Sequence, residues 1–293
     1  MHKHFIKRKS TDKLKLDKME LYTLYGFKIY IIQSLHPGEL KTGYNLHEEL
    51  RQLEHEGYCE EFIYNLIDVK SKNDFTSILR EIEQETEDNN YVPIIQIECH
   101  GNINGLSFTS NEECTWGELF SLLRPINIAC YNMLLVNLSC CNGDAIIRDI
   151  EPTKRAPFRG AIAHQGVAKP EILQSTWINF YREYLNPELR KGRGICELIW
   201  NISPNFIYYN QDIIFEYHYN LAEIRPDIFD SHIKQELIEM SIKEGPLDID
   251  PLFYKERRKK KLNSFYQKHK AHFCFYDIRT KSEEIYEEIK AYE

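Results

Sequence analysis

The sequence predicts an α/β protein with a doubly wound, mostly parallel sheet and helices on both faces. Apolar runs rich in Ile, Val and Tyr alternate with segments of helical period, as βαβ units require. The expected strands are apolar on both faces, which is typical of parallel strands covered by helices. With 293 residues, of which 42% are hydrophobic and 13% aromatic, the chain can bury one large core or two modest ones.

The first part of the expected sheet comes from two strand–helix units. The strand KIYIIQSL (28–35) is followed by the helix NLHEELRQLEHE (45–56), whose three leucines share one face. The strand EFIYNLIDV (61–69) is followed by the helix FTSILREIEQE (75–85), which Asn73 or Asp74 is expected to cap.

Three more strands complete the expected layer. The strand YVPIIQIEC (91–99) leads into NINGLSF (102–108), which reads as a tight hairpin on Asn104-Gly105, and then into the helix TWGELFSLL (115–123). The last two strands are NMLLVNLSC (132–140) and the shorter RGAIAHQG (159–166), and the helix EILQSTWINFYREYL (171–185) follows them.

We divide the chain into an N-terminal extension (1–24), an α/β core (25–200) and a C-terminal appendage (201–293) of mixed helices and strands that packs on the core. In the appendage, IIFEYHYNL (213–221) and AHFCFYDI (271–278) are interpreted as edge strands. IFDSHIKQELIEMSIKEG (228–245) and the segment around KERRKKKLNSFYQKHK (255–270) are interpreted as helices. A separate C-terminal domain is the alternative.

Charge and composition narrow the classes of partner and compartment. The net charge of −8 is spread over many acids and bases, and we read the basic run KERRKKK (255–261) as an outer helix face, so we expect no nucleic acid partner. No apolar run reaches the roughly 18 residues that span a bilayer, and no apolar signal core follows the basic start, so we expect a cytoplasmic protein. The eight irregularly spaced cysteines are expected to be free thiols.

Reactive side chains occur where two of the expected strands end. One strand ends on His100-Gly101 and the next along the chain ends on Cys140-Cys141-Asn142-Gly143. In an open parallel sheet ligands bind beyond the carboxyl ends of the strands, and adjacent strands bring their ends together. An imidazole can take the proton of a thiol near neutral pH, and glycine lets backbone N–H groups approach a developing oxyanion. The pattern therefore predicts a nucleophilic cysteine with a histidine base.

A zinc site is the alternative for these residues, because Cys99, His100, Cys140 and Cys141 are all potential ligands. Neighbours in a strand point to opposite faces of a sheet, so about two of them would lie on either side, fewer than the four of a structural zinc site. The sequence also lacks HExxH, CxxC, GxxxxGK[ST] and GxSxG motifs. We therefore expect neither a metal nor an organic cofactor.

The stretches HGNING (100–105) and CCNGD (140–144) resemble two motifs of caspase-like cysteine peptidases, His-Gly-x-x-x-Gly and Cys-x-Gly-acid. Cys141 follows His100 by 41 residues, against about 50 in caspases. LSCC (138–141) also resembles the Leu-Ser-x-Cys of the bacterial CHAT branch of these peptidases. Both alignments make Cys141 the nucleophile, whereas the usual CHAT spacing from cysteine to glycine selects Cys140. We favour Cys141, and the resemblance covers residues 28 to 166.

The resemblance implies a caspase-like fold and a cysteine endopeptidase that works through a His-Cys dyad. His100 would act as base and then as acid, and Cys141 would attack the scissile carbonyl. The backbone N–H groups of Gly101 and Cys141 would hold the oxyanion.

Three further residues are candidates for substrate binding. KTGYN (41–45) lies where caspases carry Arg-x-Gly-x-Asp, so Lys41 would favour an acidic residue before the cut, whereas Asp144 would favour a basic one and His164 would line the cleft. Each also has a purely structural reading: Lys41 as a solvated turn residue, Asp144 as a helix cap and His164 as a hydrogen-bonded residue at a strand end.

Bacterial relatives of this branch serve in antiviral defence beside pore-forming gasdermins or nucleotide-sensing modules. The resemblance therefore implies a protein or peptide substrate, with a gasdermin-like protein as one candidate. The alternatives are a non-catalytic caspase-like module that binds a protein through its C-terminal third, and an α/β thiol enzyme with another reaction, such as acyl transfer. Selective reaction of one cysteine with a peptide electrophile would separate an enzyme from a binding module.

Overall fold

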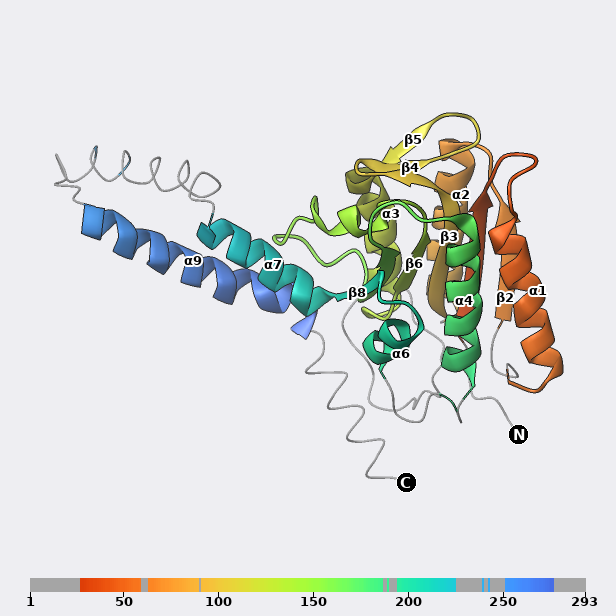
Figure 1. The fold of residues 1–293 in the computed structure, drawn as a ribbon. Coiled ribbons are helices and arrows are strands. Elements are labelled where there is room, and N and C mark those ends of the chain that lie inside the picture. The colour runs from red at the N-terminus through yellow and green to blue at the C-terminus, as the bar shows by residue number, and fades with distance from the viewer. Residues whose placement is uncertain are drawn as a thin grey trace, which may run out of the picture.

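The computed structural model describes residues 27–58, 63–89, 91–186, 194–224 and 251–276, together with residues 189, 239 and 242. These residues form an α/β layer from which a pair of helices extends as an arm (Figure 1). The expected N-terminal extension (1–24) lies outside the described residues. So does the helix expected at 228–245, apart from residues 239 and 242, which are helical.

One sheet forms the centre of the α/β layer, with strand order β2-β1-β3-β6-β7-β8. Its neighbouring strands are parallel except for β7 and β8, which are antiparallel. The strands are β1 (Phe27–Ser34), β2 (Ile63–Asp68), β3 (Val92–Asn102), β6 (Leu135–Ser139), β7 (Gly160–His164) and β8 (Phe206–Asn210). The expected α/β fold with a mostly parallel sheet is confirmed. β8 was not expected, and it joins the sheet although it lies beyond residue 200, where the expected core ends.

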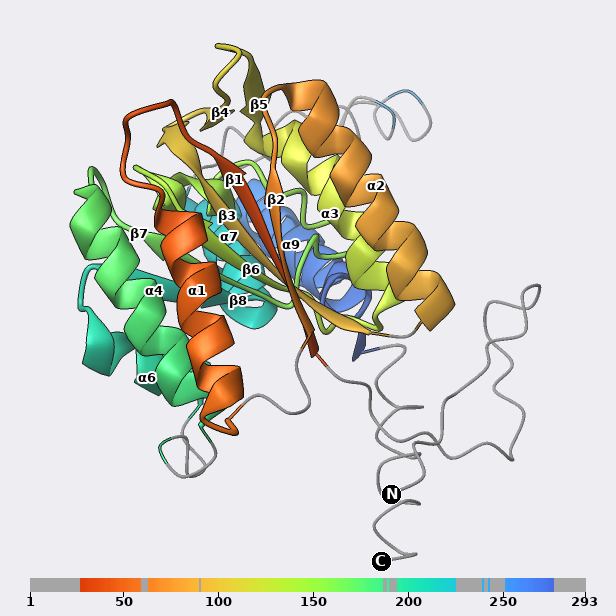
Figure 2. The same cartoon turned by 90° about the vertical axis from the view of Figure 1, so that its right-hand side faces the viewer.

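Helices cover both faces of the sheet (Figure 2). One face carries α1 (Thr42–His55), α4 (Pro170–Leu185) and the unexpected α6 (Ile195–Ile202), and the other carries α2 (Lys72–Asn89) and α3 (Trp116–Ala129). The four expected crossover helices are therefore present. Ser71, rather than Asn73 or Asp74, is the N-cap of α2: its Oγ accepts the Asp74 N–H at 3.1 Å, while Asp74 Oδ2 accepts the Ser71 N–H at 3.0 Å.

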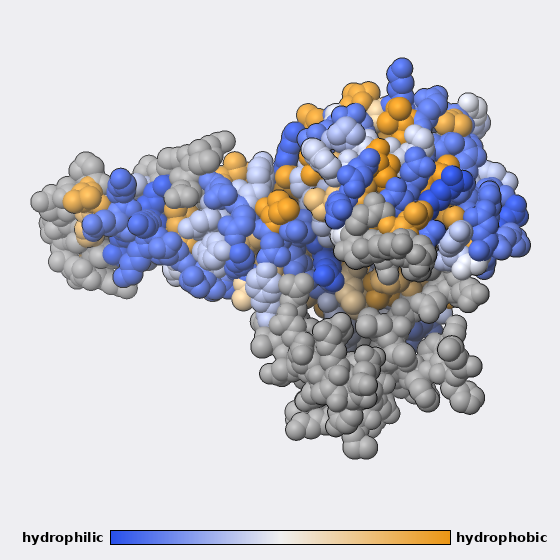
Figure 3. All heavy atoms as spheres, turned by 60° about the horizontal axis from the view of Figure 1, so that its bottom comes forward, coloured by the Kyte–Doolittle hydropathy of each residue, from blue (hydrophilic) through white to orange (hydrophobic). Residues whose placement is uncertain are grey.

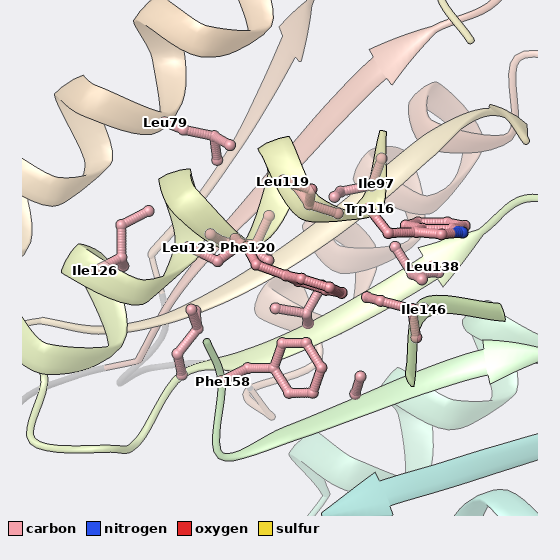
Figure 4. Packing of buried hydrophobic residues seen from close by; sticks show 14 of the residues in the cluster. Leu79, Ile97, Trp116, Leu119, Phe120, Leu123, Ile126, Leu138, Ile146 and Phe158 are labelled. Carbon is pink, nitrogen blue, oxygen red and sulfur yellow. The ribbon is translucent and has the colours of Figure 1, made fainter. Parts of the chain in front are cut away.

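The core consists of two apolar clusters separated by the sheet. In the larger one, Trp116, Leu119 and Leu123 of α3 are fully buried and face Leu138 of β6 (Figure 4). Along β3, successive residues alternate between the clusters, so that Ile95 belongs to the larger cluster and its neighbours to the other face. This alternation explains why both faces of the strands read as apolar in the sequence.

A short antiparallel ribbon extends the end of β3. It consists of β4 (Gly105–Ser107) and β5 (Glu113–Thr115). Asn102 pairs with Gly105, so the turn residues are Ile103 and Asn104, one position before the expected Asn104-Gly105. Gly105 is needed for a different reason, because a Cβ at this position would collide with the backbone of Cys114.

The C-terminal part folds into α7 (Gln211–Ile224) and α9 (Pro251–Phe273), which pack side by side in the arm. The helix expected around 255–270 is confirmed, and both expected edge strands are wrong. Residues 213–221 lie in α7, while α9 continues to residue 273 and a turn follows it; residues 277 and 278 of the second expected strand lie outside the described residues. Closely spaced aromatic residues suggested strands, but Phe215 instead stacks on Phe265 of α9, with ring centroids 6.5 Å apart.

The surface of the arm is largely hydrophilic in the view of Figure 3. None of the helices in the described part of the chain is both long and apolar enough to cross a membrane.

Candidate active site

β3 and β6 are neighbouring parallel strands, and the predicted dyad lies at and beyond their carboxyl ends. Glu98 of β3 lies opposite Ser139 of β6 in the strand register. Two residues further along each chain come His100 and Cys141. A Cβ built on Gly101 would lie 2.8 Å from the carbonyl oxygen of Cys141. The chain segments that carry His100 and Cys141 are therefore in direct contact at Gly101.

The two faces of the sheet separate the reactive residues into pairs. Cys99 and Cys140 are buried in the larger apolar cluster, where Cys140 is only 1% exposed. The side chain of His100 is 51% exposed, and Cys141 is partly exposed. Burial raises the pKa of the Cys99 and Cys140 thiols, which makes them poor nucleophiles. These observations favour Cys141 over Cys140 as the reactive thiol.

Cys141 lies against the loop between β7 and α4. The Ala168 N–H donates to the sulfur at 3.5 Å, and the thiol, when protonated, donates to the Ala168 carbonyl at 3.7 Å. The Asn142 N–H donates to the Gly166 carbonyl at 2.6 Å, and Asn142 itself has a left-handed backbone with φ 55°. The loop therefore fixes the position of the Cys141 sulfur.

His100 is paired with a carboxylate that the sequence patterns did not indicate. Its Nε2 lies 2.9 Å from Oε1 of Glu39, and its ring centroid lies 5.9 Å from that of His36. No hydrogen bond joins the His100 ring to the Cys141 thiol, and both residues lie in the described part of the chain. The ring contacts Glu39 through Nε2, and the thiol contacts Ala168.

The three residues expected to bind substrate make backbone contacts in the loops around the site. Lys41 Nζ donates to the carbonyls of Leu35 and His36, at 2.6 and 2.9 Å. Asp144 Oδ1 accepts the Gly166 N–H at 3.4 Å, and His164 Nδ1 lies 3.4 Å from the Gly166 carbonyl. The contact of His164 fits its reading as a hydrogen-bonded residue at a strand end. Asp144 is not a helix cap, because it lies inside the 3-10 helix Gly143–Ile147, whose N-cap is Asn142, and the Lys41 amine is bonded to the backbone rather than solvated. The roles of the three residues in substrate binding stay predictions.

His164 is also buried, and its ring packs edge-on against Phe206 with centroids 5.1 Å apart. In the part of the chain that the structure describes, no group of three His, Cys, Asp or Glu side chains is arranged to bind a metal ion.

A buried carboxyl lies directly below the site. Glu98 is 1% exposed, and it accepts hydrogen bonds from Thr42 Oγ1 at 2.6 Å and from Gln96 Nε2 at 2.7 Å. Burial raises the pKa of Glu98 to about 7, although these two side chains and the nearby Ser139 act in the opposite direction. Glu98 thus links β3 to the start of α1 beneath the dyad.

No known family model matches this chain, and no curated protein is significantly similar to it in sequence. The resemblance to caspase-like peptidases therefore depends on the two short motifs at the strand ends.

We expect Gly101→Ala to disrupt the contact between the strand ends, because the new methyl group would also lie 3.0 Å from Cys140 Sγ. Such overpacking costs about 1–3 kcal/mol of unfolding free energy. The matched control is Gly117→Ala in α3, where an added Cβ meets no atom within 4 Å and should be neutral or stabilising. Urea denaturation measures both, and equal stability of the two variants would contradict the close approach at Gly101.

We expect Glu98 to make the fold less stable as the pH rises. The carboxyl ionises near its ordinary pKa of 4.5 in the unfolded chain but near 7 in the folded protein. The contribution of Glu98 to the free energy of unfolding is therefore complete below pH 4.5, falls between pH 4.5 and pH 7, and is lost above pH 7. This contribution amounts to about 3 kcal/mol. Glu98→Gln should flatten this dependence in urea denaturation at pH 5 and pH 8. An unchanged dependence would show that Glu98 titrates normally.

Proposed function

We propose that this protein is a cysteine endopeptidase that hydrolyses peptide bonds with His100 as base and Cys141 as nucleophile. The observation that carries the proposal is the pairing of Glu98 with Ser139, because it brings the next residues on the same face, His100 and Cys141, to one edge of the sheet. The burial of Cys140 and the N–H contact to the sulfur of Cys141 support the choice of nucleophile.

In the proposed reaction, His100 takes the thiol proton and the sulfur of Cys141 attacks the scissile carbonyl carbon. The tetrahedral intermediate collapses as His100 gives the proton to the leaving amine, and the acyl part stays on Cys141 as a thioester. Water then attacks the thioester while His100 accepts its proton, and the carboxylate product leaves as the sulfur recovers a proton. The N–H groups of Gly101 and Cys141 are the candidates to bind the oxyanion.

Exposed apolar side chains near the site support a polypeptide substrate. Val167, which precedes the residue that bonds Cys141, is 81% exposed. Leu40, which follows the carboxylate partner of His100, and Tyr44 in the first turn of α1 are also exposed. Large apolar side chains that are exposed to solvent next to the proposed catalytic pair would bind a substrate that has apolar side chains of its own.

The biological role in this proposal depends on the resemblance alone. In that role the protein is a cytoplasmic protease of bacterial antiviral defence that cuts a partner protein, and a gasdermin-like protein is one candidate substrate. A non-catalytic interaction module is the second candidate function, and one observation favours it: no hydrogen bond joins the ring of His100 to the thiol of Cys141, although both residues lie in the described part of the chain. In such a module, the cysteines would serve only as packing residues.

Three alanine variants test the proposal. We expect Cys141→Ala and His100→Ala each to lower peptide hydrolysis by at least about a hundredfold, because each removes a reacting group. Cys140→Ala should keep most of the activity, since Cys140 faces the apolar cluster. The measurement is cleavage of a peptide library together with the intact mass after reaction with a peptide-based thiol electrophile, and the exposed Cys196 is the internal control thiol.

Each other outcome has a definite meaning. An inactive Cys140→Ala variant together with an active Cys141→Ala variant would show that Cys140 is the nucleophile. Three variants equal to the parent, or a label shared between Cys141 and Cys196, would refute the peptidase and favour the interaction module.

A further inference from the structure

The carboxylate of Glu39 is bonded to the proposed base, and its function follows from that contact. We propose that Glu39 is a positioning residue for His100, so that the site works as a Glu39–His100–Cys141 triad. This inference builds on the proposed function, because it concerns how the base of that reaction is oriented. Three features of the described residues carry it: the turn that holds Glu39, the ring nitrogen that it occupies, and the charges around the pair.

The sequence HPGE (36–39) builds a turn that holds the carboxylate in place. Pro37 occupies its second position and Gly38, with φ +91°, occupies its third, as in a type II turn. The Glu39 N–H donates to the His36 carbonyl at 3.2 Å, and the His36 N–H donates to Glu39 Oε2 at 2.6 Å. One carboxylate oxygen is therefore fixed by the backbone, and the other is left for His100.

The contact determines which nitrogen of His100 can act as a base. Oε1 of Glu39 lies 2.9 Å from Nε2, and an ionised carboxylate can only accept a hydrogen bond. The neutral ring must therefore carry its proton on Nε2, which leaves the lone pair on Nδ1. Nδ1 has no partner among the described residues, so it is the nitrogen available for the thiol proton. When the ring takes that proton, the carboxylate stabilises the imidazolium.

Glu39 is ionised at neutral pH. Partial burial alone would raise the pKa of Glu39, but hydrogen bonds from the His36 N–H and from the His100 ring outweigh that effect and lower it. Other ionisable groups lie in the elements around the pair and would shape any pH dependence. These groups are His36 and Lys41 in the same turn, Glu98 in β3, Glu113 in β5, and Cys141 and Asp144 after β6.

The decisive variant is Glu39→Gln, which keeps the size of the side chain and removes its charge. A glutamine amide can also donate to Nε2, which would stabilise the wrong tautomer. With a cleavable peptide we expect kcat to fall by about tenfold while KM stays within about twofold, because the lost interaction strengthens only as the ring becomes charged. The matched control is Glu48→Gln in α1, which removes a partly exposed carboxylate paired with Arg51 and should leave both constants unchanged.

A second measurement does not require proteolysis. The rate at which iodoacetamide alkylates Cys141 is followed from pH 5 to pH 9 by peptide mass spectrometry, in the parent, Glu39→Gln, Glu48→Gln and His100→Ala. For Glu39→Gln we expect the profile to move toward higher pH by about one unit, which corresponds to a rate about tenfold lower near pH 7. A purely structural defect would lower the amount of folded protein without moving this profile.

The outcomes separate the inference from the proposed function. If His100→Ala slows alkylation while Glu39→Gln matches the parent, the dyad stands and Glu39 has no positioning role. If His100→Ala also matches the parent, His100 does not activate the thiol, and the proposed function fails together with the inference. A shift for Glu39→Gln that is absent from Glu48→Gln supports the triad.

Discussion

The candidate site depends on the parallel pairing of β3 with β6. The register that sets Glu98 opposite Ser139 also determines which side chains share a face beyond the ends of these strands. A slip of one residue would bring His100 to the face that Cys140 now occupies, inside an apolar cluster where the thiol is held in its neutral form. Gly101 permits this pairing at its tightest point, because any Cβ there would press on the backbone of Cys141.

Backbone groups, more than side-chain pairs, fix the functional groups around this edge. The His36 N–H holds the carboxylate of Glu39, and the Ala168 N–H contacts the sulfur of Cys141. Below them, a carboxyl with a raised pKa is buried among neutral hydrogen-bond partners, which costs stability above neutral pH. Buried groups with perturbed pKa values gather at functional sites more often than elsewhere. The edge therefore combines side chains held by backbone contacts with a buried carboxyl whose ionisation lowers the stability of the fold.

Local patterns in the sequence predicted the sheet, its crossover helices and the two strand ends, because these depend on periodicity and on strand alternation. The same alternation predicted that Cys99 would point away from His100, and Cys140 away from Cys141. β8 was missed because it has only five residues, of which Phe206 and Tyr209 are buried and the other three partly exposed, so it has no continuous apolar run. Glu39 was missed because its partner, His100, is 61 residues away in the sequence, and no local pattern in the HPGE turn predicts that contact.

The central claim is that His100 and Cys141 share one face at adjacent strand ends, and a His100→Cys variant tests it most directly. Neighbouring parallel strands bring such residues within the Cα separation that a disulfide requires, about 4.4–6.8 Å. Mild oxidation followed by peptide mapping under non-reducing conditions should show a link between position 100 and Cys141, and the link should vanish when Cys141→Ala is added. A link from position 100 to Cys140, or none to Cys141, would contradict the shared face and with it the proposed dyad.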